Sequence, residues 1–171
     1  IAAGRNSHKS FISAAALSDF DVDLLNSATP SYLSCPLTAE DIKKYLSERK
    51  EMPTAVYLTS PDYLGYTSDI AGIAEVCHEA GVLLIVDNAH GAYLGFCEQN
   101  MHPIALGADM CCDSAHKTFP VLTGGAYLHI ANSFDADKDE VRSALALFAS
   151  TSPSYLILQS LDLCNSYLAD D

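Results

Sequence analysis

The chain has 171 residues, of which 49% are apolar, so one domain with a sizeable hydrophobic core is expected rather than disorder. Its 22 Asp and Glu residues outnumber its 9 Lys and Arg residues, and a formal net charge of −13 disfavours binding to nucleic-acid phosphates. The same charge is compatible with cationic small molecules, although solubility alone explains it equally well. No apolar run approaches the roughly 20 residues that span a bilayer, and no signal peptide is recognised, so we predict no membrane association.

The six cysteines are scattered, and none of them forms a CxxC pair of the kind that binds zinc. We therefore predict no metal site, free thiols and a reducing, cytoplasmic setting. The cysteines are Cys35, Cys77, Cys97, Cys111, Cys112 and Cys164.

Helical and extended patterns alternate along the chain, without an internal repeat or a low-complexity linker. In chain order, we predict a helix from Thr38 to about Arg49, a strand at 54–59, a helix at 69–80, strands at 82–87, 108–113 and 125–130, and helices at about 136–149 and 154–169. Thr38 is suited to cap its helix, and the acidic residues in the first turn suit the helix dipole. Gly81 is expected to end the second helix.

Strands that alternate with helices predict an α/β fold, with a mostly parallel sheet covered on both faces as a three-layer sandwich. The continuous apolar run at 82–86 supports this prediction, because half-exposed strands alternate in polarity instead. Ligands of such sheets bind beyond the carboxyl ends of the strands. Asp87 and the segment 113–117 both follow predicted strands, so a carboxylate and Lys117 are expected on the same edge of the sheet.

Asp87 and Lys117 are the residue types that an aldehyde cofactor with a pyridine ring requires. A lysine can form an imine with the aldehyde once it has lost its proton, and a buried aspartate keeps the ring nitrogen protonated. Ser114 and its turn offer a hydroxyl and backbone amides to a phosphate group. Ala89 leaves room for a flat ring to lie against the chain.

Each of these residues, taken alone, is more often structural or solvated than functional. We expect His78 to be solvated and His129 to be structural, and His102 has no evident role. The pairing of Asp87 with Lys117 at strand ends is harder to explain in this way.

Five motifs in order strengthen the functional interpretation. They are RNSHKS (5–10), TSPDYLGYTSDI (59–70), DNAHG (87–91), DSAHKT (113–118) and STSPSY (150–155). Together they resemble the large domain of the bacterial ornithine/lysine/arginine decarboxylases, which are pyridoxal-phosphate enzymes of the aspartate aminotransferase fold type. SxHK alone is a weak signal, whereas five ordered motifs with domain-like spacing are specific. The resemblance implies that residues 1–171 form a single domain, part of the pyridoxal-phosphate-binding large domain.

The resemblance implies how the chain holds pyridoxal 5'-phosphate. Lys117 would carry the cofactor as a Schiff base, and Asp87 would pair with the pyridine nitrogen. His8 would stack on one face of the ring, and Ala89 would pack against the opposite face.

Three further residues receive roles from the same resemblance. Ser114 and His116 would help to hold the phosphate, and His90 would lie on the substrate side. The reaction would be decarboxylation of lysine, arginine or ornithine, and either His90 or Lys117 would supply the proton that replaces carbon dioxide. The partners implied are a basic amino acid and a second copy of the chain, in a homodimer or a higher homo-oligomer.

The chain also departs from the family pattern. Family members are longer, with a phosphate-cradling turn before RNSHKS and a C-terminal domain, and this chain starts at Ile1. We therefore predict a large domain that is incomplete at both ends, and a fragment that is weak or inactive while its full-length parent is a decarboxylase. Asp62 stands where the family usually has threonine, which is expected to change the local hydrogen bonding.

Two alternatives stay open. An aminotransferase or a carbon–sulfur lyase of the same fold type would share Asp87 and Lys117, but RNSHKS and STSPSY are more particular to the decarboxylases. A non-catalytic scaffold domain is the other alternative, and the presence of Lys117, Asp87 and His8 together weighs against it.

Overall fold

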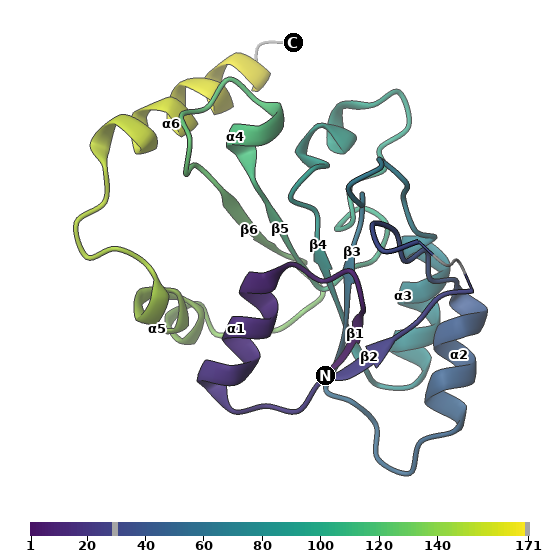
Figure 1. The fold of residues 1–171 in the computed structure, drawn as a ribbon. Coiled ribbons are helices and arrows are strands. Elements are labelled where there is room, and N and C mark those ends of the chain that lie inside the picture. The colour runs from purple at the N-terminus through teal and green to yellow at the C-terminus, as the bar shows by residue number, and fades with distance from the viewer. Residues whose placement is uncertain (29–30, 170–171) are drawn as a thin grey trace.

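The computed structural model describes residues 1–28 and 31–169. In this part of the chain, six strands form one sheet in the order β2-β1-β3-β4-β5-β6 (Figure 1). The strands are β1 (Ala2–Gly4), β2 (Asp23–Leu25), β3 (Ala55–Thr59), β4 (Leu83–Asp87), β5 (Met110–Asp113) and β6 (Tyr127–Ile130). The helices are α1 (Lys9–Ser18), α2 (Ala39–Ser47), α3 (Ile70–Glu79), the 3-10 helix η1 (Ala92–Phe96), α4 (Ala115–Thr118), α5 (Lys138–Phe148) and α6 (Tyr155–Ala169).

The predicted signals at the start of α2 and at the end of α3 act as expected. The Thr38 amide donates to Asp41 Oδ2 over 2.9 Å, and the Asp41 amide donates to Thr38 Oγ1 over 3.2 Å, so both residues satisfy open backbone donors at the start of α2. Gly81 follows α3 with φ of +69°, a conformation that residues with a Cβ adopt at a cost. The other predicted elements are present, with ends that differ by at most two residues.

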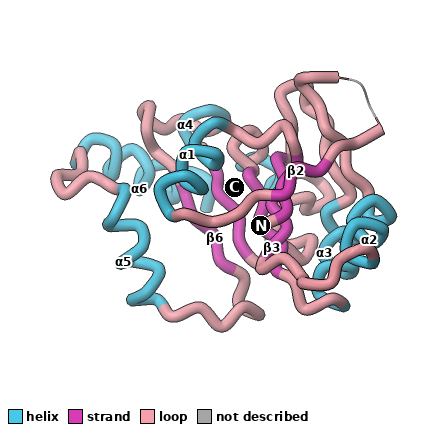
Figure 2. Tube along the Cα trace, turned by 60° about the horizontal axis from the view of Figure 1, so that its bottom comes forward, coloured by secondary structure: helices cyan, strands magenta, loops and turns pink. Residues whose placement is uncertain are grey.

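The two faces of the sheet are covered by different helices. On one face, Val56, Leu84, Val86 and neighbouring side chains form the main core with α2 and α3. On the other face, Phe11 of α1 stacks on Tyr57 with ring centroids 4.1 Å apart. Because side chains alternate along a strand, Tyr57 and Val56 point to opposite faces of the sheet. Figure 2 shows α1 separated from the α2–α3 pair by the strands. The predicted α/β architecture is therefore confirmed.

The last strand is the antiparallel member of the mostly parallel sheet that was predicted. β1 to β5 pair in parallel, but β6 pairs antiparallel with β5. The connection at 114–126 contains only the short helix α4 and turns, so the chain folds back from the edge at which β5 ends. α6 packs near this return through the buried Cys164, whereas α5 has no buried residue.

All six cysteines are free thiols, as predicted. Among the helices of the described residues, none combines the length and the apolar character needed to cross a membrane.

Candidate active site

A pocket of about 230 Å³ lies at the carboxyl edge of the sheet. Parallel pairing brings the ends of β3 and β4 level, with Thr59 opposite Asp87, and Asp87 in turn lies opposite Cys112 of β5. The pocket brings together all but one of the site residues predicted from the sequence. Those that line it are His8, Asp87, Ala89, His90, Ser114 and Lys117.

Asp87 supplies a buried carboxylate, with 7% of the residue exposed. Tyr57 Oη donates to Asp87 Oδ2 over 3.2 Å, and the Ala89 amide donates to Oδ1 over 3.1 Å. Burial, followed by the charge of Asp87, raises the pKa of Tyr57 above its ordinary value, so this hydroxyl stays protonated and keeps donating. The two donors fix the orientation of the carboxylate within the pocket.

Lys117 supplies the amine. Its Nζ lies 3.3 Å from His90 Nε2, across two segments that are 27 residues apart in the sequence. Burial lowers the pKa of His90 below its ordinary 6.5, and the positive charge of Lys117 lowers it further, so the imidazole is predominantly neutral at pH 7. The Tyr63 ring lies beside His90, with centroids 5.3 Å apart. A neutral imidazole can accept a proton from the protonated form of the neighbouring amine.

The remaining predicted residues in the pocket come from loops that follow strands. His8 caps α1 through its Nδ1, which accepts a hydrogen bond from the Ser10 amide over 3.2 Å. Ser114 precedes α4, and its side chain makes no capping hydrogen bond to that helix. Its hydroxyl is therefore available to a ligand in the pocket.

His116 is the predicted site residue that the structure does not bring into this pocket. Its Nδ1 lies 2.9 Å from the Gly125 carbonyl oxygen, and its backbone amide donates to the same oxygen over 3.2 Å. This side chain holds the start of α4 against the turn that leads into β6. A phosphate contact from His116 stays a prediction.

Six residues that line the pocket were not among the predicted site residues, namely Asn6, Ser10, Tyr57, Thr59, Tyr63 and Cys112. Tyr57 and Thr59 alternate along β3, so both point to the pocket side of the sheet, and Asn6 follows β1. Thr59 Oγ1 is buried and has no hydrogen-bond partner among residues 1–28 and 31–169. The strand period was a usable signal, because it places Thr59 on the side opposite to the core residue Leu58.

Asp62 has a structural role of its own. It is buried, and its Oδ1 accepts hydrogen bonds from the amides of Leu64 and Tyr66 over 2.8 and 3.0 Å. Ser34 Oγ donates to its other carboxylate oxygen. The aspartate therefore closes the 62–66 turn and ties it to the segment around Ser34.

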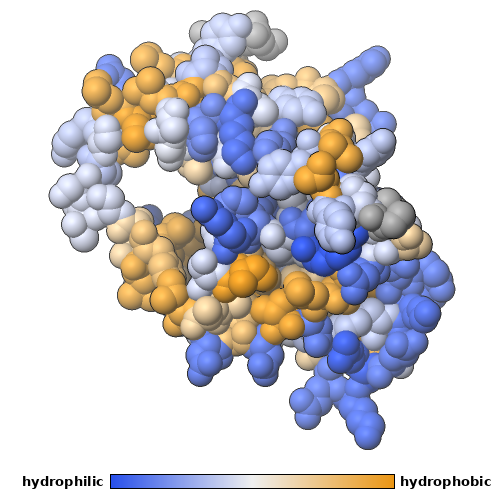
Figure 3. Space-filling view, viewed as in Figure 1, coloured by the Kyte–Doolittle hydropathy of each residue, from blue (hydrophilic) through white to orange (hydrophobic). Residues whose placement is uncertain are grey.

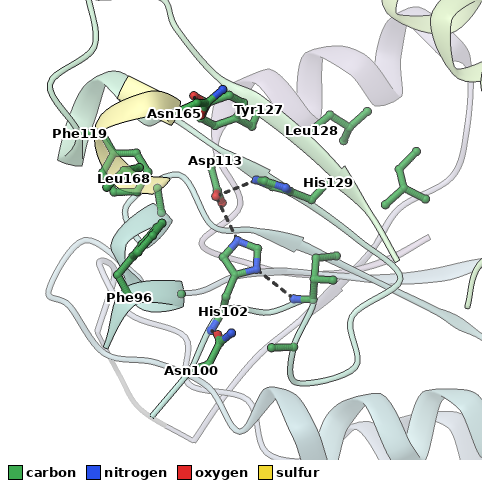
Figure 4. Close-up of a pocket in the computed structure, with 15 residues that line it drawn as sticks. Phe96, Asn100, His102, Asp113, Phe119, Tyr127, Leu128, His129, Asn165 and Leu168 are labelled. Carbon is green, nitrogen blue, oxygen red and sulfur yellow. Dashed lines mark hydrogen bonds and ion pairs between the residues drawn. The ribbon is translucent and has the colours of Figure 1, made fainter. Parts of the chain in front are cut away.

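A second polar cluster surrounds Asp113 (Figure 4). Asp113 Oδ2 accepts hydrogen bonds from His102 Nε2 over 3.1 Å and from His129 Nε2 over 3.0 Å, and Oδ1 accepts one from Asn88 Nδ2 over 2.6 Å. The expectation that His102 has no role is therefore wrong, whereas His129 is a structural residue, as expected. Burial raises the pKa of Asp113, but the three donors outweigh burial and hold it well below its usual range.

His78 also differs from expectation. Its Nε2 lies 3.0 Å from Asp109 Oδ2, so this half-exposed histidine has a carboxylate partner and is not merely solvated.

Comparison with known proteins identifies the family of the chain. The family described as "Orn/Lys/Arg decarboxylase, major domain" matches residues 1–171. The chain belongs to this family. It is 35% identical over 167 residues to the uncharacterized protein YaaO of Bacillus subtilis (strain 168), which covers 96% of this chain and 35% of the relative. It is 31% identical over 170 residues to the arginine decarboxylase of the same organism, over 98% of this chain and 34% of the relative.

Solved structures show the same fold at lower identity. The structure of Oryza sativa TDC with PLP matches with a TM-score of 0.64 and 18% identity, over 77% of this chain and 29% of that one. The archaeal O-phosphoseryl-tRNA(Sec) selenium transferase matches with a TM-score of 0.62 and 18% identity, over 77% of this chain and 31% of that one. The chain thus spans about a third of the length of the proteins that it resembles.

Proposed function

We propose that the whole protein decarboxylates a basic amino acid with pyridoxal phosphate, and that the pocket at the carboxyl edge is part of its active site. The observation that carries the proposal is the presence of Lys117 and the buried Asp87 in one pocket, as a pyridine–aldehyde cofactor requires. Family membership and the arginine decarboxylase relatives support it.

The donor set of the pocket fits pyridoxal phosphate. Asp87 is a carboxylate held by two donors, which suits a protonated ring nitrogen. Thr59 Oγ1 is buried without a partner in the described part of the chain, and a polar ligand would satisfy it. Lys117 would hold the cofactor, Asp87 would pair with its ring, His8 and Ala89 would flank it, and Ser114 would bind its phosphate. When bound, the cofactor would act as the electron sink for decarboxylation.

The residues around Lys117 prepare its amine for reaction. A protonated Lys117 is not a nucleophile, and the neutral His90 at 3.3 Å offers a route for the proton to leave. After carbon dioxide has left, the same pair can return a proton to the substrate carbon. Either Nζ of Lys117 or Nε2 of His90 would be the donor.

Arginine is the first substrate to test, followed by lysine and ornithine. Four of the relatives are arginine decarboxylases, at 29–31% identity. The net charge of −13 favours the approach of a cationic substrate, although this effect concerns rates of encounter rather than specificity.

The cofactor proposal can be tested by trapping. Pyridoxal phosphate is added to the protein, and borohydride reduces the imine that its aldehyde forms with a lysine. Peptide mass spectrometry then locates the phosphopyridoxyl group. We expect the group on Lys117 in the wild type and no group at this position in Lys117→Ala. Lys43→Ala, which changes a lysine of α2 outside the pocket, is the matched control and should label as the wild type does. Labelling spread evenly over the surface lysines would contradict the proposal.

The reaction itself is tested with the full-length protein. Carbon dioxide and the matching amine should form together from arginine, lysine or ornithine, and Lys117→Ala should abolish both. Formation of a keto acid without carbon dioxide would favour the aminotransferase alternative. Trapping on Lys117 without turnover of any basic amino acid would leave the cofactor site in place and reject the substrate class.

A further inference from the structure

A cluster of side chains of types that can bind a metal ion lies on the sheet face opposite the Lys117 pocket. Cys111 and Asp113 alternate with Cys112 along β5, so they point away from the side on which Cys112 lines that pocket. His129 of β6 pairs directly opposite Cys111, and His102 comes from the loop before β5. His102, Cys111 and Asp113 thus bring one ligand atom each within 4.8 Å of one another, and His129 Nε2 lies 3.0 Å from Asp113 Oδ2.

The ligand atoms of His102, Cys111 and Asp113 are spaced nearly as the ligands of one small ion are. Zinc lies about 2.0–2.3 Å from nitrogen, oxygen and sulfur ligands, so tetrahedral ligands are roughly 3.3–3.6 Å from one another. In the cluster, Asp113 Oδ2 lies 3.1 Å from His102 Nε2 and 3.0 Å from His129 Nε2. Cys111 Sγ lies 3.7 Å from His102 Nε2, and the ligand atoms of His102, Cys111 and Asp113 all lie within 4.8 Å of one another.

The surroundings also suit a metal ion. Cys111 and Asp113 are buried, with 1% and 3% of each residue exposed, so these ligands are already dehydrated. Asn88 Nδ2 donates to Asp113 Oδ1 over 2.6 Å, which orients the carboxylate so that Oδ2 faces His102 and His129. A pocket of about 720 Å³ opens onto His102, Asp113 and His129, and it provides an entry path (Figure 4).

We propose that His102, Cys111, Asp113 and His129 form a binding site for a divalent transition-metal ion, with Zn²⁺ as the best match. Imidazole nitrogen together with thiolate sulfur suits zinc, whereas magnesium and calcium prefer oxygen ligands alone. The ion would fasten β6 and the loop around His102 to β5. The proposal does not depend on the function of the Lys117 pocket.

Binding requires a change in protonation. Cys111 must release its thiol proton to solvent, and each histidine must move the proton from Nε2 to Nδ1 or lose it. The Ile104 amide approaches His102 Nδ1 at 3.4 Å, a long contact that binding would give up. Because the thiol proton must leave when the ion binds, the affinity for the ion should fall as the pH is lowered.

Metal titration of the reduced protein, without pyridoxal phosphate, tests the site. Zn²⁺ affinity is measured by competition with a chromophoric chelator, and Co²⁺ reports the ligand type through its absorption spectrum. We expect one ion per chain and a thiolate-to-cobalt band. Cys111→Ser should remove the band, and both Cys111→Ser and His129→Gln should weaken Zn²⁺ binding by about tenfold or more.

The neighbouring thiol provides the matched control. Cys112→Ser changes the next residue of the same strand, on the opposite face, and should keep the wild-type affinity and cobalt spectrum. His129 has a side chain that is 38% exposed, so His129→Gln is the variant expected to fold even if a change at a buried ligand does not. Absence of stoichiometric binding by the wild type, or equal affinity in the wild type, Cys111→Ser and His129→Gln, would overturn the proposal.

Discussion

Thr59 and Tyr57 lie two residues apart on β3 and face the same pocket, but their hydroxyl groups differ in their partners. Tyr57 donates to Asp87, whereas Thr59 Oγ1 is buried without a partner in the described residues. A buried hydroxyl without a hydrogen bond costs free energy, and a ligand that enters the pocket could supply the partner. Thr59 is therefore a sensitive test of whether the pocket receives a polar ligand.

Replacing Thr59 with valine should have opposite effects on stability and on binding. Thr59→Val removes the unsatisfied hydroxyl and keeps the side-chain shape, so the free energy of unfolding without cofactor should rise by about 1 kcal/mol. The affinity for pyridoxal phosphate should fall, because the ligand loses a partner. Urea denaturation and a fluorescence titration with the cofactor measure the two effects. Thr54→Val, just before β3 and exposed, is the control, and equal cofactor affinity in Thr59→Val and the wild type would remove Thr59 from the binding site.

The lowered pKa of Asp113 predicts a specific dependence of the free energy of unfolding on pH. Its pKa in the folded protein is below the ordinary 3.8, because three donors outweigh burial. The folded state therefore binds this proton less readily than the unfolded state. The resulting stabilisation is fully present above the unfolded pKa and is lost as the pH falls through 3.8 toward the folded value.

Asp113→Asn should therefore destabilise the protein at neutral pH and much less in acid. We expect a loss of roughly 1.5–3 kcal/mol at pH 7, the range for hydrogen bonds to a charged group. The difference from the wild type should shrink below pH 3.8, as followed by urea denaturation across the acid range. Asp135→Asn, which changes a carboxylate outside the cluster, serves as the control. A loss that is independent of pH would show that shape, not charge, sets the effect.

At the level of elements, the segments with long, regular patterns were predictable. The helices beginning after Thr38 and Asp69, and the strand that ends at Asp87, follow from caps, periodicity and continuous apolar runs. β1 and β2 span three residues each, too few for a pattern to develop, so they were missed. The antiparallel direction of β6 could not be predicted either, because the apolar pattern of a short strand does not encode its direction.

The two polar clusters differ in predictability for the same reason. Asp87 and Lys117 follow predicted parallel strands, so the rule that ligands bind at the carboxyl edge places them together from the residue order alone. His102 and His129 lie 11 and 16 residues from Asp113. Their meeting depends on the path of the 98–109 loop and on the register of β6 against β5. Neither can be read from residue types.

Gly91, which directly precedes the 3-10 helix η1, allows a steric test of the DNAHG loop. A Cβ on Gly91 would lie 2.2 Å from Asn88 Oδ1 and 2.6 Å from Pro61 Cδ, so Gly91→Ala forces this loop to move. We expect a loss of about 1–3 kcal/mol in the free energy of unfolding and weaker pyridoxal phosphate binding, because Asp87 and His90 belong to the same loop. Gly95→Ala in the same helix meets only His102 Cβ at 3.7 Å and should have little effect. Similar stability and binding in the two variants would show that the loop tolerates the shift.

At the level of the whole molecule, apolar surface is concentrated on the last two helices. α5 has no buried residue, yet it exposes Leu147 and Phe148, and α6 exposes Tyr155 and Leu156. The space-filling view shows apolar side chains gathered over the α5 and α6 side (Figure 3). Exposed apolar patches of this kind mark surfaces that another chain or segment covers.

We therefore predict that the protein self-associates through α5 and α6, consistent with the homo-oligomer expected from the sequence. Leu147 is 79% exposed, so replacing it should not disturb the core. Leu147→Asp should weaken association by about tenfold or more, because burying a leucine contributes about 1.5–3 kcal/mol and the new charge resists burial. Ser143→Asp adds the same charge to α5 without removing apolar surface, which makes it the matched control. Sedimentation over a range of concentrations measures the constants. If Leu147→Asp and Ser143→Asp weaken association equally, added charge rather than lost apolar contact is responsible, and if the wild type is monomeric throughout, the apolar face of α5 is not a self-association surface.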